Sequence, residues 1–184
     1  MEGWHVILAF WALDSLGGGM LVTFMGMYVV ETTGSYLMLS LVTVLPSFMG
    51  FASKLWGMLS DYYGRRKPFM LLGTLLSALV WAIPLLALSP WTLVVVTALS
   101  SALWSIGDPA LYAALVEGAE DKGRRLGYMN ACSSAGWTLG CLLSGFTYEA
   151  LGARGLIAVV LALFTGAALI IAVGFHEEPR PRPM

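Results

Sequence analysis

Two carboxylates lie in strongly apolar stretches of the sequence. Asp14 falls in "WALDSLGGGM", and Asp108 falls in "WSIGDPALYAALVEG", directly after a run of 40 residues, 68–107, that contains no charged side chain. A charge at the depth of a lipid bilayer costs about 2.5–3.5 kcal/mol on insertion scales, so such a residue usually faces a polar interior. Three roles fit the two acids: a proton carrier in a transporter, a catalytic acid in a membrane enzyme, or, for Asp108, the end of a helix.

Helical spacing places other side chains beside these acids. Phe10 and Asp14 are four residues apart, and Trp104, Asp108 and Tyr112 follow one another at the same interval. Residues four apart lie on one face of a helix, so each acid has aromatic neighbours. For Asp108 a structural alternative is open, because Asp before Pro109 is a good start signal for a helix that resumes after a kink.

The composition indicates that these helices lie in a bilayer. The chain has 184 residues, of which 58% are hydrophobic and 11% charged, and its mean hydropathy is +0.79. A soluble domain usually carries about 25% charged residues. With the lipid bilayer as solvent, the net charge of -1 gives no reason to expect a nucleic-acid partner.

The apolar segments predict an all-α membrane protein with a transmembrane domain over 1–175 and a polar cytoplasmic tail over 176–184. A helix needs about 20 apolar residues to cross the hydrocarbon core. Six such helices are expected, at about 4–30, 36–56, 68–88, 91–115, 126–148 and 155–175.

The positions of the basic residues predict the orientation. Cytoplasmic loops carry an excess of Lys and Arg. With the N-terminus inside, the outer loops hold Arg154 alone, and the inner segments hold Lys54, Arg65, Arg66, Lys67, Lys122, Arg124, Arg125, Arg180 and Arg182. We therefore expect a multi-pass protein of the cell membrane with both termini in the cytoplasm.

The segment "GMLSDYYGRRKPF", residues 57–69, lies between the second and third predicted helices. It resembles the signature loop of the major facilitator superfamily, G-x-L-x-D-x-x-G-R-R/K. The matching residues are Gly57, Leu59, Asp61, Gly64, Arg65 and Arg66. Tyr62 departs from the pattern, since many members have Arg directly after the Asp. The alternative is a generic basic inner loop.

Physical roles can be read from this motif. Gly57 allows two helices to approach closely, Gly64 permits a tight turn, and Asp61 can face the positive N-terminus of a helix. The motif is therefore expected to act in structure and gating. In the fifth predicted helix Gly136, Gly140 and Gly145 are similar to an antiporter pattern of the family, but Cys141 stands where its Pro would be. Simple packing of small residues is the favoured interpretation there.

The resemblance covers one six-helix, N-terminal-type half of a fold that normally contains two halves. We expect either a fragment of a longer protein or a half-size transporter. The half-size transporter would assemble as a parallel homodimer, or pair with another six-helix half. In the homodimer Asp61 would approach residues Gly127 to Asn130 of the second copy, because the family's loop meets the other half there.

The resemblance also implies that the first and fourth helices line a central cavity. The cavity residues expected are Asp14, Asp108, Phe10, Trp104 and Tyr112, with Asn130 and Trp137 from the fifth helix. Aromatic walls with acids at the base would suit a lipophilic or cationic small molecule. The expected function is secondary active transport by alternating access, coupled to protons, with no catalytic residue, metal or cofactor.

Two other classes of membrane protein share features with this sequence. Intramembrane aspartyl proteases carry G-x-G-D and P-A-L segments, but here Ser105 replaces the first Gly and "PAL" follows Asp108 at once, although in that family it lies in a different helix. A membrane assembly partner or sensor built on the same scaffold would not transport at all. An adjacent gene encoding another six-helix half would indicate a heterodimer.

Overall fold

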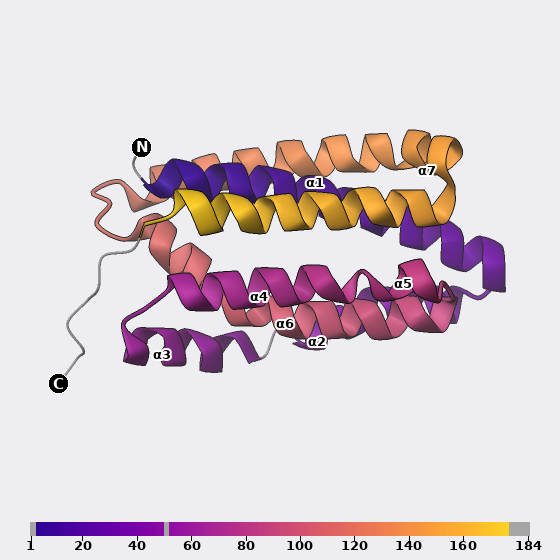
Figure 1. Cartoon of the computed structure of the whole chain (residues 1–184), viewed down its shortest axis with the longest axis horizontal. Helices are drawn as coiled ribbons and strands as arrows, with labels where there is room; N and C mark the ends of the chain where they lie inside the picture. The colour runs from indigo at the N-terminus through magenta and orange to yellow at the C-terminus, as the bar shows by residue number, and fades with distance from the viewer. Residues whose placement is uncertain (1–2, 50–51, 177–184) are drawn as a thin grey trace.

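The computed structural model of the chain describes residues 3–49 and 52–176. In this part the chain is all-α and has no strand (Figure 1). The helices are α1 (Gly3–Thr33), α2 (Tyr36–Met49), α3 (Ser53–Tyr63), α4 (Lys67–Val80), α5 (Ile83–Leu86), α6 (Pro90–Val116) and α7 (Lys122–Gly174). Five helical segments of the described residues are long and apolar enough to cross a membrane.

The longest helix, α7, reverses its direction at Gly152. There φ is 68° and ψ is -179°, a conformation that is essentially restricted to glycine. The arms 122–151 and 153–174 consequently lie side by side (Figure 1). The sequence predicts separate helices at 126–148 and 155–175, and the structure joins them with almost no loop.

The prediction of a loop over residues 57–69 was wrong for its first half. Residues 57–63 belong to α3, because the stretch from Ser53 to Tyr63 contains no proline and its single glycine, Gly57, disfavours a helix by only about 1 kcal/mol. The helix ends at Gly64, whose φ of 61° lies in the left-handed region. Within the helix predicted at 36–56 the structure describes α2 up to Met49 and α3 from Ser53, and residues 50–51 lie outside the described part. The predicted tail, 176–184, is described only at His176.

The single helix predicted at 68–88 is interrupted after Val80. The backbone N–H groups of Trp81 and Ala82 donate to the carbonyl oxygens of Ala78 and Leu79, each over 3.0 Å, as in a tighter turn. Pro84 has no N–H to donate to the carbonyl of Val80, so the α-helical pattern cannot continue through it. The chain restarts as the short α5.

Helix α6 runs through both Asp108 and Pro109. Its N-terminus is instead capped by Ser89, whose hydroxyl oxygen accepts a hydrogen bond from the Thr92 N–H over 3.1 Å. Asp108 therefore lies inside a helix, and the interpretation of Asp108 as the cap of a resumed helix was wrong.

Helix α1 packs tightly against the first arm of α7. Gly136 and Gly140 face the backbone carbonyls of Ala12 and Leu16 so closely that a Cβ atom at either glycine would collide with them. One helical turn farther on, the Ser144 hydroxyl donates to the Met20 carbonyl oxygen over 2.9 Å. Small residues of this kind allow helices to meet backbone to backbone in a membrane. This contact fixes the position of Asp14 relative to α7.

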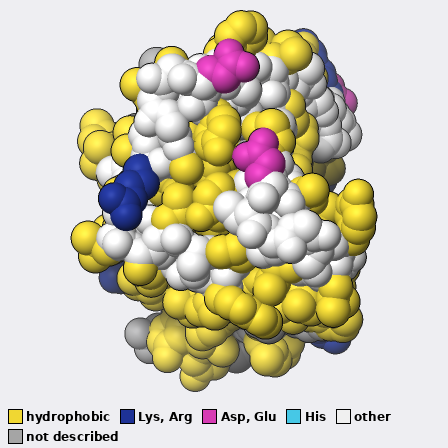
Figure 2. Space-filling model, turned by 90° about the vertical axis from the view of Figure 1, so that its right-hand side faces the viewer, with side chains coloured by type: hydrophobic (Ala, Val, Ile, Leu, Met, Phe, Trp, Pro, Cys, Tyr) yellow, Lys and Arg dark blue, Asp and Glu magenta, His cyan; other side chains and the backbone are white. Residues whose placement is uncertain are grey.

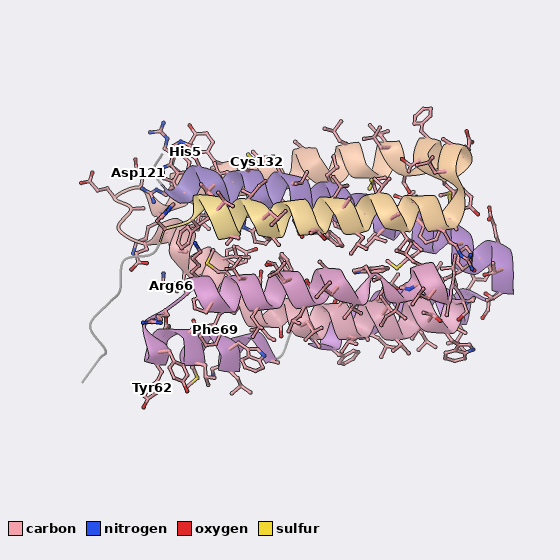
Figure 3. All side chains as sticks on the ribbon, in the orientation of Figure 1. His5, Tyr62, Arg66, Phe69, Asp121 and Cys132 are labelled. Carbon is pink, nitrogen blue, oxygen red and sulfur yellow. The ribbon has the colours of Figure 1, made fainter. Side chains whose placement is uncertain are left out.

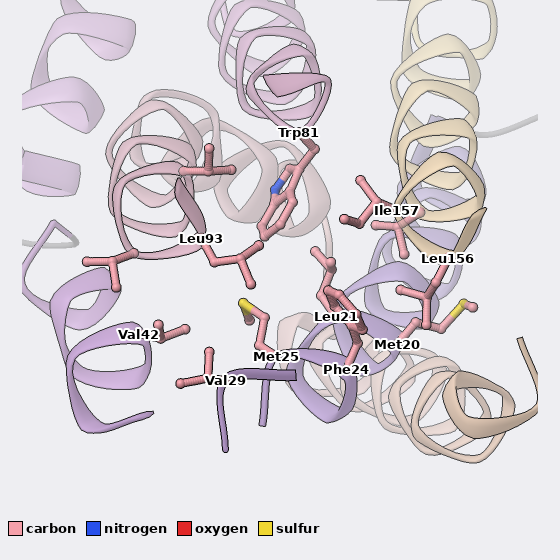
Figure 4. Packing of buried hydrophobic residues seen from close by; sticks show 13 residues of the cluster. Met20, Leu21, Phe24, Met25, Val29, Val42, Trp81, Leu93, Leu156 and Ile157 are labelled. Atoms are coloured by element: carbon pink, nitrogen blue, oxygen red, sulfur yellow. The ribbon is translucent and has the colours of Figure 1, made fainter. Parts of the chain in front are cut away.

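Buried apolar side chains form one cluster toward each end of the bundle. The cluster in Figure 4 includes Met20, Leu21, Phe24, Met25, Val29, Val42, Trp81, Leu93, Leu156 and Ile157. The other includes Val6, Ile7, Phe10, Met70, Leu111, Leu115 and Ile171. Asp14 lies along α1 between the α1 residues of the two clusters.

The two ends of the bundle differ in charge. Arg66 and Asp121 lie at one end (Figure 3). The opposite end carries the connection between α1 and α2 and the turn at Gly152, and it shows few charged side chains (Figure 2). That the basic end faces the cytoplasm stays a prediction.

Candidate functional site

A partly open cavity of about 420 Å³ is lined by residues of α1, α2, α6 and both arms of α7, by Ser77 of α4 and by Trp81 directly after α4. Its lining residues are Asp14, Gly18, Leu21, Val22, Met25, Val42, Thr43, Pro46, Ser77, Trp81, Thr97, Ser100, Ser101, Trp104, Trp137 and Phe164. The carboxylate of Asp14 is the only charged group in this lining set. The cavity is of a size that holds small organic ligands.

Three of the predicted cavity residues line this cavity, namely Asp14, Trp104 and Trp137. Phe10 is fully buried and its ring stacks on Trp104, with the ring centroids 5.8 Å apart. Phe10 therefore supports the cavity wall from behind. Asn130 is exposed on α7 and does not line the cavity.

Asp108 and Tyr112 also lie outside the cavity lining but adjoin it. The Trp104 side chain donates a hydrogen bond to the Asp108 carboxylate. Asp14 and Asp108 lie close enough to repel each other when both are charged, and Asp108 acts on Tyr112 in the same way. The two acids thus form one electrostatic pair. Trp104 is hydrogen-bonded to Asp108 and lines the cavity together with Asp14.

Trp11 is a member of this group that the sequence does not reveal. Its ring centroid lies 6.0 Å from that of Trp104 and 5.4 Å from that of Tyr112, so it bridges two aromatic residues of α6. The available signal was its position three residues before Asp14, which places both on one side of α1. Its contact with α6, however, depends on how the two helices cross.

The hydroxyl-bearing wall of the cavity was also missed. Thr97, Ser100 and Ser101 precede Trp104 at helical spacing, so they continue the face of α6 that carries Trp104 and Asp108. The same helical spacing, extended from Trp104 toward the N-terminus of α6 as well as toward Tyr112, would have predicted this wall from the sequence.

The basic motif joins three helices at the charged end of the bundle. The guanidinium of Arg66 lies 2.9 Å from a carboxylate oxygen of Glu117 after α6 and 3.6 Å from one of Asp61 in α3. A Cβ atom at Gly57 would lie 3.3 Å from Cβ of Pro109, so α3 approaches α6 closely there. Leu59 and Arg65 are exposed.

The sequence profile of the Major Facilitator Superfamily matches residues 8–184. The chain belongs to the major facilitator superfamily. No curated protein matches the sequence significantly. The family assignment confirms the resemblance seen in the motif at residues 57–69. Because members of this superfamily are transporters, this major facilitator is a multi-pass membrane protein of a transporter class.

Substitution of Arg66 by Gln is expected to destabilise this major facilitator by about 1 kcal/mol, because the carboxylates of Asp61 and Glu117 lose the mostly buried guanidinium that pairs with both. The measurement is thermal unfolding of the purified protein in mild detergent. Arg65→Gln is the matched control, since the exposed Arg65 side chain should tolerate the change within about 0.5 kcal/mol. Equal losses for both variants would contradict a specific role of Arg66.

Proposed function

We propose that the chain is a secondary transporter that moves a small molecule across the membrane by alternating access, coupled to protons through Asp14. One observation carries the proposal: in a chain of a transporter family, the Asp14 carboxylate lines a cavity of about 420 Å³ inside the helix bundle. A carboxylate at that depth can hold a proton or face a substrate, as a coupled carrier requires.

Asp108 is proposed as a second acid that responds to the first. It does not line the cavity, but its charge acts on Asp14. A proton that arrives at or leaves Asp14 therefore changes the field at Asp108, and through the Trp104 hydrogen bond this change can reach the cavity wall. Asp108 is accordingly expected to tune coupling, with Asp14 as the main proton site.

We propose six membrane crossings, with α7 supplying two of them on either side of Gly152, and both termini in the cytoplasm of a cell-membrane protein. Lys and Arg are concentrated in the segments that this topology places inside the cell, and this bias supports the orientation. The turn at Gly152 supports the pairing of the last two crossings.

The proposed assembly is a parallel homodimer in which a second copy supplies the other wall of the transport pathway. The family's two halves are related by an axis along the membrane normal, which two parallel copies would reproduce. Asp61 and Gly127, in the second turn of α7, are both exposed and thus available to a second copy. Another six-helix half is the alternative partner.

A pair of cysteines tests this assembly. In a background without Cys132 and Cys141, Asp61→Cys combined with Gly127→Cys is expected to give a cross-linked dimer in native membranes on mild oxidation. Asp61→Cys with Glu149→Cys, at the other end of the same arm, is the control and should remain uncross-linked. A chain that is monomeric in both mild detergent and liposomes would contradict the homodimer.

Transport itself is tested in liposomes that contain the purified protein and a pH-sensitive dye in their lumen. A panel of neutral, anionic and cationic small molecules is applied from outside. At least one class is expected to cause proton movement in protein-containing vesicles and none in empty vesicles. If no class moves protons in the presence of the protein, the proposal of a proton-coupled carrier fails.

A further inference from the structure

Four of the five hydroxyl groups that line the cavity have already used their protons. Each donates to a backbone carbonyl of its own helix or of a neighbour: Thr43 to Leu39 over 3.1 Å, Ser77 to Thr74 over 3.0 Å, Thr97 to Leu93 over 2.8 Å and Ser100 to Ser77 over 3.2 Å. A hydroxyl has one proton and two lone pairs. These four side chains can therefore offer a ligand only acceptor oxygens.

Two indole N–H groups of the cavity wall are also engaged. Trp81 Nε1 donates to the Ser100 hydroxyl oxygen over 3.1 Å, and Trp104 donates to the Asp108 carboxylate. Of the described lining side chains, only Ser101 and Trp137 have donors for which the structure shows no such bond. Asp14 in its charged form only accepts. The polar surface of the cavity is thus rich in acceptors and poor in donors.

Four of the nine apolar side chains in the cavity wall are aromatic. Trp81, Trp104, Trp137 and Phe164 all line the cavity, and no Lys, Arg or His is among the lining residues in the described part of the chain. Aromatic faces attract cations, most strongly where water is excluded. An anion would find neither a basic side chain nor more than two free donors, so the chemistry excludes it.

From this arrangement we propose that the cavity binds an organic cation that bears N–H donors, such as an alkylguanidinium or a protonated amine on an apolar body. The cationic head lies at Asp14 and the hydroxyl oxygens accept its remaining N–H groups, while the body packs against Trp104 and Trp137. This inference rests on the proposed function, because it names the substrate class of the same cavity.

Three probes that share one apolar body separate the contributions. Phenethylguanidine has a permanent charge and N–H donors, trimethyl(phenethyl)ammonium has the charge without donors, and phenethyl alcohol has neither the charge nor any N–H group. Binding to the full chain in lipid nanodiscs is measured by isothermal titration calorimetry. We expect the guanidinium to bind at least about tenfold more tightly than the alcohol, with the trimethylammonium in between.

Asp14→Asn should reduce the advantage of the guanidinium over the alcohol to less than about threefold. Glu31→Gln, which removes an exposed carboxylate at the end of the same helix, should leave the advantage unchanged. The inference is overturned if the guanidinium does not bind, if the alcohol binds equally well to the unaltered protein, or if Asp14→Asn keeps the preference. The series on the unaltered protein keeps the test valid should the variant fail to fold.

The failure of this inference differs from the failure of the proposed function. If the guanidinium does not bind but another class of compound moves protons through Asp14, only the substrate class is wrong. If the guanidinium binds as expected and no compound moves protons, the binding site stands and the transporter proposal fails.

Discussion

Replacing Asp14 by Asn is expected to reduce proton-linked transport by about 100-fold or more while leaving the fold intact. Asn has nearly the same shape as Asp but cannot release or accept the coupled proton, and loss of a positioned proton-transfer group typically costs a factor of 10²–10⁴. Among the residues that the structure describes, Asp14 is the only charged side chain that lines the cavity. The measurement is substrate-dependent proton movement in liposomes, with thermal unfolding as the check on folding.

Two further variants test whether this loss of transport is specific to Asp14. Asp108→Asn is expected to lower transport less than Asp14→Asn, because Asp108 acts on the cavity through Asp14 and Trp104 rather than lining it. Glu149 is an exposed acid near the C-terminal end of the first arm of α7. Glu149→Gln should therefore have no effect on transport. If both Asp14→Asn and Asp108→Asn leave transport unchanged, neither acid carries the proton.

The largest expected loss of stability follows from Gly140→Val. A Cβ atom at this position would collide with the carbonyl oxygen of Leu16, and a backbone atom cannot move aside as a flexible side chain can. Either α1 and α7 separate or both helices bend, and overpacking of this kind costs about 1–3 kcal/mol, or more. Unfolding in mixed detergent micelles, followed by circular dichroism, measures the change.

Gly145→Val is the matched control on the same arm. A Cβ atom at Gly145 would have no neighbour within 4 Å, so only a small change in helix propensity should remain, below about 1 kcal/mol and in favour of valine, because glycine is the poorer helix former. Similar losses for the two variants would show that α1 and the first arm of α7 do not meet at Gly140.

The sequence predicted the family and the fold class because both depend on local patterns. The spacing of Gly57, Asp61, Gly64 and Arg66 is carried by one short segment, and apolar length alone indicates membrane helices. The pairing of Trp104 with Asp108 also follows from spacing within one helix. None of these inferences needs knowledge of how two helices cross.

Features that depend on helix crossings were missed or misplaced. Asn130 precedes Gly136 by six residues, about 1.7 turns of helix, so it lies away from the face of α7 that Gly136 turns toward α1. Trp11 reaches Tyr112 only because α1 and α6 lie side by side there. The helical form of residues 57–63 was missed because a motif known as a loop was given a loop's conformation, although its residues favour a helix.

The cavity wall illustrates the same limit. Trp81 follows the end of α4, where Pro84 breaks the predicted helix, and its indole N–H reaches Ser100 in α6. The sequence gives no pairing between these two residues, which are brought together only by the packing of α4 against α6. The acceptor-rich character of the cavity follows from such contacts and thus from the structure.

The most direct test of the central claim, that the Asp14 cavity is a transport site open to each side of the membrane in turn, is cysteine labelling. Ser101→Cys, at the cavity wall, is placed in a background without Cys132 and Cys141 and treated with a membrane-impermeant maleimide in right-side-out and in inverted vesicles. Leu142→Cys, at an exposed apolar position outside the cavity, is the control and should stay unlabelled in both. The account predicts labelling of Ser101→Cys from both sides; labelling from one side only, or from neither, would contradict it.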